Sequence, residues 1–517
     1  MAGRVYLVGA GPGDPGLLTL KGKRCLEQAD IVIYDYLANP RLLDHARPDA
    51  ERILVGKHGG GTRVEQTAIN QLIIDHARQG KTVVRLKGGD PFIFGRGGEE
   101  AAAAHAAGID FEIVPGVTSA IAVPAYAGIP LTHRELASNV IFTTGYEYPS
   151  KTEPAVHWSE LARSGSTLVI LMTQRQLRNN MQQLVASGLD PKTPAAVIQW
   201  GTRADQYTVV GTAATIADLA ERQAMKPPVL AVVGAVVALR EQLNWFERKP
   251  LFGRRIVITR PRAQAAEFAE LLEAWGAEII PFPTIETVPP ESFAPLDAAI
   301  RRAAEFDWVV FTSANGVRVF FARLQTLGAD IREFHRAHFA AIGPQTARSL
   351  QAYCVRVESI PEEFRAEGVV AALAAAGVAG KRVLLPRAAG AREVLPIELR
   401  ALGATVEEVV TYASVLPRMH AEELRELLLR GAADLVTFTS SSTVHNFVAA
   451  FDGAVDRVLA HTAIGCIGPV TADTARSYGL RVAIQPATYT IPAFVDAIVQ
   501  YCGSTPPRAQ LAAGTDN

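Results

Sequence analysis

The sequence predicts an α/β protein made of several domains. Short apolar, β-branched runs such as Val5–Val8 and Ile31–Tyr34 alternate with turns and helical patterns. Several turns are rich in glycine, which is typical of α/β sheets that bind ligands at the carboxyl ends of their strands. The 517 residues also exceed the roughly 250–300 residues at which a single hydrophobic core stops growing.

The composition is that of an ordinary globular protein, with 49% hydrophobic and 20% charged residues. A net charge of -1 argues against a general nucleic-acid-binding protein, which usually carries a basic face. Electrostatic steering of an acidic substrate would therefore have to be local. The longest apolar run, Val229–Leu239, is shorter than the ~20 residues of a membrane span.

The four cysteines are too far apart to form a paired metal-binding motif. They are Cys25, Cys354, Cys466 and Cys502. We expect reduced thiols in a cytoplasmic protein, and no metal site. No signal peptide is expected, because the apolar stretch near Met1 is broken at once by the glycine- and proline-rich segment Gly11–Gly16.

The glycine-rich turn after Val5–Val8 allows two interpretations. Its spacing, Gly11-x-Gly13-x-x-Gly16, matches a dinucleotide fingerprint, and Asp35 lies about 20 residues downstream, where an acid would bind a ribose. Pro12 and Pro15 argue against this interpretation, because each removes an N–H group that a pyrophosphate would need. A nicotinamide cofactor is therefore the weaker alternative.

The stretch Arg85–Glu100, RLKGGDPFIFGRGGEE, follows an apolar run that ends at Val84 and leads into a predicted helix, Glu99–Ala107. Its five glycines let a ligand approach the backbone, and Asp90 can hydrogen-bond a polar group. Together with Pro115–Arg134, PGVTSAIAVPAYAGIPLTHR, it resembles the tetrapyrrole methylase family, and within it the uroporphyrinogen-III C-methyltransferases. The resemblance covers about the first half of the chain and implies a two-lobed tetrapyrrole methylase fold.

The resemblance implies S-adenosyl-L-methionine as the cofactor. By position, the residues that would bind it are Pro12, Gly88, Gly89, Asp90, Ile93, Thr118, Ser119, Met172 and Gly201. Asp35 would be the base that deprotonates the pyrrole system, and Lys57 the proton donor. A carboxylate suits this task, because loss of the pyrrole N–H proton pushes electron density onto the carbon that takes the methyl group. The alternatives are that Asp35 caps the next turn and that Lys57 is a solvated lysine.

The implied substrate is a polycarboxylated tetrapyrrole, which basic residues of the first half would bind. We assign this role to Arg96, His133 and Arg134; further candidates are Lys57, His58, Arg63, Arg85 and Lys87. Two positions depart from the family. Many relatives carry histidine where Tyr146 stands, and relatives often have an acid at Ala235.

The charged stretch Glu247–Arg255 contains a proline and a glycine and predicts a linker after a first domain of residues 1–246. A second α/β region, 256–502, follows it. The small polar residues at 503–517 predict a disordered tail.

The second half contains an internal repeat. Trp308–Val317 is echoed by Leu435–Val444, and Ala341–Ala347 is echoed by Cys466–Ala472. Each copy predicts a strand, a turn and a helix whose first N–H groups attract carboxylates. Two matched lobes therefore predict a cleft for a polycarboxylate.

Several short strings of the second half resemble uroporphyrinogen-III synthase, a bilobal α/β fold. In chain order they are Thr259–Pro261, Phe311–Ser313, Ile342–Pro344, Val410–Tyr412 and Phe438–Ser440. The resemblance implies a first lobe of residues 256–286 plus 417–502 and a second lobe of residues 290–411. The chain would cross between the lobes near Thr284–Pro290 and Tyr412–Pro417.

The same resemblance implies residue roles in the second half. Tyr412 would help the leaving hydroxyl depart, although a hinge aromatic is the alternative. Residues that would contact the substrate are Thr312, Ser313, Thr346, Thr439 and Ser440.

Together the resemblances imply a bifunctional enzyme of siroheme or cobalamin biosynthesis. The second half would close hydroxymethylbilane to uroporphyrinogen III, and the first half would methylate that product twice to precorrin-2. The alternative is a methylase of a later corrin intermediate joined to a non-catalytic tetrapyrrole-binding module. A homodimer formed through the methylase half is also implied, with no nucleic-acid or membrane partner.

Overall fold

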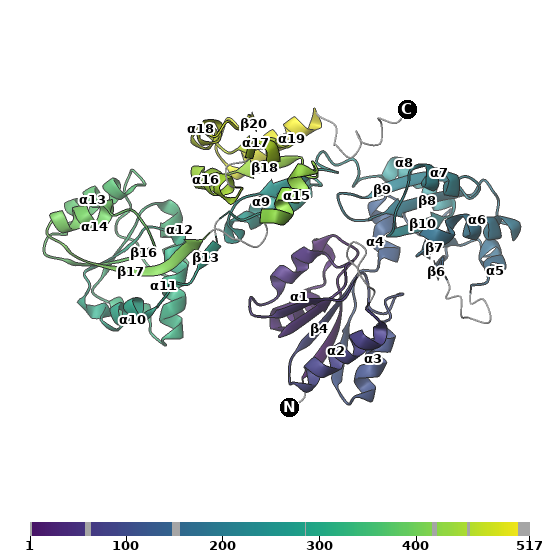
Figure 1. Cartoon of the computed structure of the whole chain (residues 1–517), viewed down its shortest axis with the longest axis horizontal. Helices are drawn as coiled ribbons and strands as arrows, with labels where there is room; N and C mark the ends of the chain where they lie inside the picture. The colour runs from purple at the N-terminus through teal and green to yellow at the C-terminus, as the bar shows by residue number, and fades with distance from the viewer. Residues whose placement is uncertain are drawn as a thin grey trace. The chain divides into compact units, whose positions relative to one another are not determined.

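The structure is a computed structural model, and it describes residues 3–56, 64–146, 156–284, 286–415, 421–451 and 455–504. Contacts divide the chain into two compact units, Met1–Ile256 with Glu270–Ile279 and Val495–Asn517, and Val257–Ala269 with Ile280–Phe494. The described residues form four five-stranded sheets flanked by helices (Figure 1). None of the helices in this part of the chain could cross a membrane.

The first sheet is parallel throughout, in the order β3-β2-β4-β1-β5. Its strands are β1 (Arg4–Gly9), β2 (Ile31–Tyr34), β3 (Glu51–Leu54), β4 (Val83–Lys87) and β5 (Asp110–Val114). Helix α1 (Leu20–Gln28) covers one face, and α2 (Gln66–Arg78) and α3 (Gly97–Ala106) cover the other (Figure 1). Because all five strands run in one direction, the loops after β1, β2, β4 and β5 lie along one edge of the sheet.

The second sheet is mixed, in the order β6-β7-β10-β8-β9. Its strands are β6 (Val140–Thr144), β7 (Thr167–Leu171), β8 (Pro194–Gln199), β9 (Tyr207–Thr212) and β10 (Val229–Val233). Helices α6 (Leu177–Ala186) and α7 (Ile216–Arg222) pack on one face, and α4 (Ser119–Tyr126) packs on the other. The first half also contains α5 (Trp158–Arg163), α8 (Arg240–Leu243) and the short 3-10 helices Pro15–Leu17, Pro40–His45, Gln174–Gln176 and Ala235–Leu239.

The third sheet has the order β12-β11-β18-β19-β20. Its strands are β11 (Arg255–Ile258), β12 (Glu278–Pro281), β18 (Leu435–Phe438), β19 (Ala463–Cys466) and β20 (Val482–Ile484). The helices that accompany it are α9 (Arg262–Ala274), α15 (Ala421–Leu429), α16 (Ser441–Ala450), α17 (Val455–Val458), α18 (Pro469–Ser477) and α19 (Ile491–Gly503).

The fourth sheet has the order β13-β17-β16-β14-β15 and is parallel except for β13. Its strands are β13 (Glu286–Val288), β14 (Trp308–Phe311), β15 (His338–Ala341), β16 (Arg382–Ala388) and β17 (Thr405–Val415). The accompanying helices are α10 (Ala294–Arg301), α11 (Ala314–Thr326), α12 (Pro344–Gln351), α13 (Ala366–Ala375) and α14 (Val394–Ala401), with 3-10 helices at Ala303–Glu305 and Ile331–Phe334.

The internal repeat of the sequence appears as a repeated order of elements. Strand β14, helix α11, strand β15 and helix α12 follow one another in the fourth sheet, as β18, α16, β19 and α18 do in the third. In both copies the two strands pair in parallel, with Phe311 opposite Ala341 and Phe438 opposite Cys466. The chain leaves the third sheet after Pro281, and β13 pairs antiparallel with the end of β17. Of the return crossing predicted near Tyr412–Pro417, residues 412–415 belong to β17, and residues 416 and 417 lie outside the described residues.

Two element boundaries differ from the sequence prediction. Strand β4 continues past Val84 to Lys87, so Arg85 and Lys87 belong to a buried strand and not to the loop. The strand tolerates these cations because carboxylates of the protein pair with them, as described below. Helix α3 begins at Gly97 and ends at Ala106, whereas the sequence predicted a helix from Glu99 to Ala107.

Of the tail predicted at residues 503–517, only residues 503 and 504 lie within the described part of the chain.

The predicted linker is anchored at its first residue. The Glu247 carboxylate accepts hydrogen bonds from Gln206 Nε2 at 2.7 Å and Thr208 Oγ1 at 2.6 Å, and it also pairs with Arg240. Glu247 therefore packs with the first half, and Arg248 of the predicted linker also donates to the Glu241 carbonyl at 2.7 Å. Leu251, farther along the predicted linker, is fully buried.

Candidate active sites

Three glycine-rich loops meet at the carboxyl edge of the first sheet. Gly11 and Gly89 exchange backbone hydrogen bonds with N···O distances of 3.2 and 2.8 Å. A Cβ atom on Gly9 would lie 2.5 Å from Gly116 Cα, and one on Gly116 would lie 2.4 Å from the Gly89 carbonyl oxygen. Only glycine allows this packing, because a side chain would force the loops apart.

The first of these loops, residues 10–16, has already used most of its backbone donors. Four of its five N–H groups donate within the protein: Ala10 to the Lys87 carbonyl, Gly11 to the Gly89 carbonyl, Asp14 to Thr202 Oγ1 and Gly16 to Asp14 Oδ1. Pro12 and Pro15 have none to offer. This loop cannot cradle a pyrophosphate with its backbone, which argues against the nicotinamide alternative.

Asp90 ties two of the loops together. Its Oδ1 accepts a hydrogen bond from Phe92 N at 2.8 Å, and its Oδ2 accepts one from Gly116 N at 3.0 Å. Thr118 Oγ1 accepts from Ala120 N at 3.3 Å and caps α4. Both side chains therefore shape the edge, and each oxygen keeps a lone pair for a ligand.

Other residues predicted to bind the cofactor lie on these loops or on the second sheet. A Cβ atom on Gly88 would lie 2.8 Å from Leu37 Cβ, so the Gly88 backbone packs on the loop that begins at Asp35. One on Gly89 would lie 3.6 Å from Ser119 N. Ile93 is 38% exposed.

Gly201 and Met172 come from the second sheet. A Cβ atom on Gly201 would lie 2.4 Å from Val123 Cγ1 of α4, so Gly201 packs against the helix that Thr118 caps. Met172 directly follows β7, has a positive φ of 55° and is 51% exposed. Met172 is therefore not a residue of the hydrophobic core.

Asp35 follows β2 at the edge where the loops meet. Its Oδ1 accepts a hydrogen bond from Arg85 Nη2 at 2.5 Å, and 28% of its side chain is exposed, against 2% for Arg85. Arg85 Nη1 donates to the Ile33 and Leu86 carbonyls, both at 3.3 Å. Arg85 therefore fixes the position of the Asp35 carboxylate and leaves its second oxygen, Oδ2, to accept a proton.

A second carboxylate completes a buried ionic network. Glu100, whose side chain is 0% exposed, accepts on Oε1 from Arg85 Nε at 3.1 Å, Lys87 Nζ at 2.9 Å and Gln66 Nε2 at 3.1 Å. Its Oε2 has no hydrogen-bond partner among the described residues. Burial lowers the pKa of Lys87, as does the neighbouring Arg85, while Glu100 opposes the shift. With Asp35, the network holds two cations and two carboxylates, so its formal charges balance.

In the second half, Tyr412 lies on β17 and is 6% exposed. Its hydroxyl lies 2.9 Å from Ser313 Oγ. Ser313 Oγ also accepts from Gly316 N at 3.0 Å and caps α11, so its own proton can be donated to the phenol oxygen. In that arrangement the Tyr412 proton is available for a leaving oxygen.

The other predicted hydroxyls of the second half occupy matched positions in the repeat. Ser440 Oγ accepts from Thr443 N at 3.3 Å and caps α16, as Ser313 caps α11. Thr312 and Thr439, which precede these caps, are both half-buried. Thr346 on α12 is 4% exposed, and its counterpart on α18, which the sequence analysis did not select, is Thr471 at 5%.

The repeat is broken at the tyrosine. Thr411 Oγ1 donates to the Arg387 carbonyl at 3.1 Å, and Thr284 Oγ1 donates to the Thr259 carbonyl at 3.1 Å, so the two threonines correspond. Tyr412 follows the first of them, but isoleucine follows the second in the sequence. The phenol therefore belongs to one copy, while the helix caps belong to both.

Comparison with known proteins assigns each half of the chain to a protein family. The model of the tetrapyrrole (corrin/porphyrin) methylases matches residues 4–217, and that of uroporphyrinogen-III synthase HemD matches residues 266–496. The porphyrin biosynthesis protein HemD of Ruminiclostridium josui is 35% identical over 501 residues, which cover 97% of this chain and 98% of that protein. The chain belongs to the tetrapyrrole methylases and the uroporphyrinogen-III synthases, fused in one polypeptide.

Two further relatives match the methylase half. The S-adenosyl-L-methionine-dependent uroporphyrinogen III methyltransferase of Methanosarcina barkeri is 54% identical over 242 residues, covering 47% of this chain and 95% of that one. The crystal structure of the Thermus thermophilus uroporphyrin-III C-methyl transferase with S-adenyl homocysteine is 39% identical and covers 46% of this chain and 100% of that one, with a TM-score of 0.40.

The predicted basic residues of the methylase half have different surroundings. Arg85 and Lys87 are 2% and 3% exposed and bonded to carboxylates of the protein, so the prediction that they receive substrate carboxylates is wrong. Arg96 is exposed and pairs with Glu99 through bonds of 2.9 and 2.6 Å. Arg134 is also exposed.

The remaining basic candidates of the methylase half are His133, Lys57, His58 and Arg63. His133 is half-buried, and its Nδ1 accepts from Glu135 N at 3.3 Å. Lys57, His58 and Arg63 lie outside the described residues. Among the described residues, no group of three or more His, Cys, Asp or Glu side chains could hold a metal ion.

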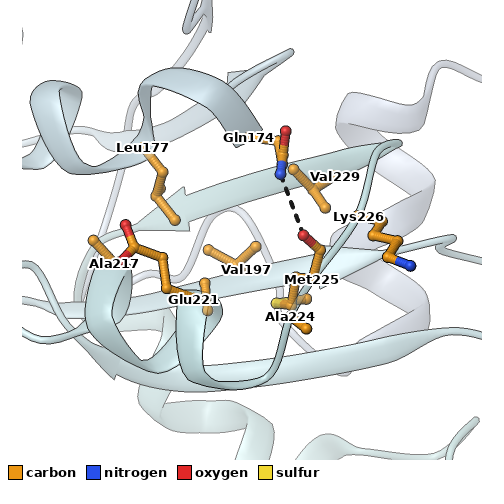
Figure 2. Close-up of a pocket in the computed structure, with 10 residues that line it drawn as sticks. Gln174, Leu177, Val197, Ala217, Glu221, Ala224, Met225, Lys226 and Val229 are labelled. Carbon is orange, nitrogen blue, oxygen red and sulfur yellow. Dashed lines mark hydrogen bonds between the residues drawn. The ribbon is translucent and has the colours of Figure 1, made fainter.

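The methylase half also contains a pocket of about 350 Å³ between α6, α7 and the second sheet (Figure 2). The residues that line it are Gln174, Leu177, Val197, Ala217, Ala220, Glu221, Ala224, Met225, Lys226 and Val229. Gln174 donates to the Met225 carbonyl at 3.3 Å. None of the predicted site residues lines this pocket, so we give it no part in the chemistry.

Proposed function

We propose that this chain carries out two consecutive steps of tetrapyrrole synthesis. The synthase half closes hydroxymethylbilane to uroporphyrinogen III, and the methylase half transfers two methyl groups to that product to form precorrin-2. The observation that carries the methylase assignment is the Asp35 carboxylate, held by buried Arg85 at the edge where three glycine loops meet. The name of the Methanosarcina barkeri relative supports both the cofactor and the substrate.

In the methylase half, Asp35 acts as the base. Its Oδ2 takes the proton from a pyrrole N–H, and the ring carbon gains the electron density needed to attack a methyl group. S-adenosyl-L-methionine, when bound, supplies that methyl group from its sulfonium. Asp90, Thr118 and the close-packed glycines shape the loops that would hold the cofactor, and Met172 and Gly201 contribute from the second sheet. Lys57 is proposed as the proton donor.

In the synthase half, Tyr412 acts as the proton donor. Its hydroxyl protonates the departing hydroxyl of the linear tetrapyrrole, which leaves as water, while Ser313 holds the phenol oxygen at 2.9 Å. The resulting azafulvene-like cation is attacked by a substituted carbon of the same chain, and rearrangement inverts the last ring. Holding the substrate curled is the larger part of this catalysis, because it makes the reacting carbons neighbours.

The assembly and location of the protein belong to the same proposal. We place the protein in the cytoplasm because its four cysteines are few and far apart in the sequence, as in proteins whose thiols stay reduced. The resemblance to the methylase family implies a homodimer formed through that half, and we include it in the proposal. We place the methylase domain at residues 1–246 and the synthase domain at 256–502.

Binding and turnover of each half test the proposal separately. Calorimetry of the full chain should show binding of S-adenosyl-L-methionine and none of NAD. Tight binding of NAD alone would reject the methylase assignment. Incubation with hydroxymethylbilane should give uroporphyrinogen III in the absence of the methyl donor, and a substrate that stays linear or closes without ring inversion would reject the synthase assignment.

A further inference from the structure

Two exposed aromatic rings occupy the same position in the two copies of the synthase repeat. Phe364 follows Gly343 of the first Gly-Pro turn by 21 residues, and Tyr489 follows Gly468 of the second by 21 residues. Phe364 lies two residues before α13, and Tyr489 lies two residues before α19. They are 61% and 59% exposed. The spacing from the Gly-Pro turn, the position before a helix and the exposure of the ring therefore all recur in both copies.

Each ring lies against the backbone of its own Gly-Pro turn. A Cβ atom on Gly343 would lie 3.3 Å from Phe364 Cγ, and one on Gly468 would lie 3.3 Å from Tyr489 Cγ and Cδ1. The φ angles of the two glycines, -171° and -163°, are extended values that any residue adopts. Each glycine therefore gives the ring room, because a Cβ atom there would be in tight contact with the ring, and its backbone conformation does not require glycine.

The rings lie at the edge that carries the other candidate residues. Gly343 follows the carboxyl end of β15, while Ser313 follows that of β14, and these strands are parallel neighbours. In the other copy, Gly468 follows β19 and Ser440 follows β18 in the same arrangement. Each ring is thus held at the edge where its copy presents a hydroxyl-capped helix.

We propose that Phe364 and Tyr489 are stacking platforms for pyrrole rings of the linear tetrapyrrole, one in each lobe of the synthase half. This inference rests on the proposed synthase function and names two side chains that would contribute to substrate binding in that half. An aromatic face suits a pyrrole, since stacked rings attract one another beyond the area that they bury. The rings bind substrate and do not take part in proton transfer.

Kinetics of Phe364→Leu and Tyr489→Leu in the full chain test the inference. Each substitution keeps an apolar side chain on the glycine and removes the aromatic face. The KM for hydroxymethylbilane should rise about three- to tenfold per variant, while kcat stays within about twofold. The double variant should also release more of the isomer closed without ring inversion. Tyr489→Phe keeps the ring and should keep the wild-type KM.

Tyr353→Leu is the matched control. Tyr353 is 41% exposed, but its ring stacks on Phe321 with centroids 4.2 Å apart. The Tyr353→Leu substitution should therefore leave the KM for hydroxymethylbilane unchanged. Unchanged KM values in folded Phe364→Leu and Tyr489→Leu proteins, or a loss of thermal stability as their only effect, would overturn the inference while the synthase function stands. A wild-type chain without ring-closing activity would overturn both.

Discussion

The buried network around Glu100 gives the sharpest test of how the methylase half is held together. Replacing Lys87 with methionine leaves the buried Glu100 carboxylate with one cation fewer, and replacing Glu100 with glutamine leaves Lys87 without its carboxylate. Removing one partner of a buried ion pair costs about 3–5 kcal/mol, because the remaining charge is uncompensated. We expect a local loss of stability of this size for each single variant.

The double variant should lose much less than the sum of the two. With Lys87→Met and Glu100→Gln together, the remaining ionic pair is Arg85 with Asp35, which is balanced and bonded at 2.5 Å. No buried charge then lacks a partner, so the two substitutions should couple strongly. Because the Asp35 carboxylate keeps its Arg85 contact, methyl transfer by the double variant should stay near that of the wild type.

Hydrogen exchange of the full chain measures this effect locally. Peptides that cover residues 83–106 should exchange about a hundred- to a few thousandfold faster in each single variant, since about 1.4 kcal/mol corresponds to a factor of ten. Arg96→Gln is the control: it removes an exposed pair with Glu99, for which at most about 1 kcal/mol is expected. Additive losses in the double variant would refute the reasoning, because they would mean that the charges do not compensate one another.

Three further predictions concern the two reactions and the linker. Asp35→Asn should depress methyl transfer by about a hundredfold or more while calorimetric binding of S-adenosyl-L-methionine and ring closure stay intact; wild-type methylation would remove Asp35 from catalysis. Tyr412→Phe should slow ring closure by roughly ten- to ten-thousandfold and Ser313→Ala by less, as measured by the rate of uroporphyrinogen III formation from hydroxymethylbilane. A rate of the Tyr412→Phe variant within about twofold of wild type would make Tyr412 a packing residue. Cutting the chain between residues 248 and 250, beyond the Glu247 anchor, should give two folded pieces that each keep one reaction, and an insoluble piece would show that the halves depend on each other.

The sequence was informative where a pattern has one physical cause. Alternating strands and turns, and the repeat of Phe311–Ser313 in Phe438–Ser440, predicted the sheets and the matched helix caps, because local sequence determines both. Pro12 and Pro15 predicted a loop that is poor in N–H donors, and the structure shows that most of the remaining donors are used within the protein.

The sequence was not informative where the role of a residue depends on distant partners. In the sequence, Arg85 and Lys87 look like part of a polar loop. The fold brings the Asp35 and Glu100 carboxylates to these two cations, and this pairing allows them to lie on a buried strand. The anchor of Glu247 on Thr208 depends on a contact across 39 residues. Signals did exist for two omissions: the repeat itself points from Thr346 to Thr471, and from Phe364 to Tyr489.

The central claim is that one chain performs both steps in succession. The most direct measurement is the mass and isomer identity of the product after incubation of the full chain with hydroxymethylbilane and S-adenosyl-L-methionine that carries an isotopically labelled methyl group. We predict precorrin-2 with two labelled methyl groups, and uroporphyrinogen III when the methyl donor is left out. An unlabelled product in the presence of the donor, or a product with the same isomer composition as buffer alone, would contradict the claim.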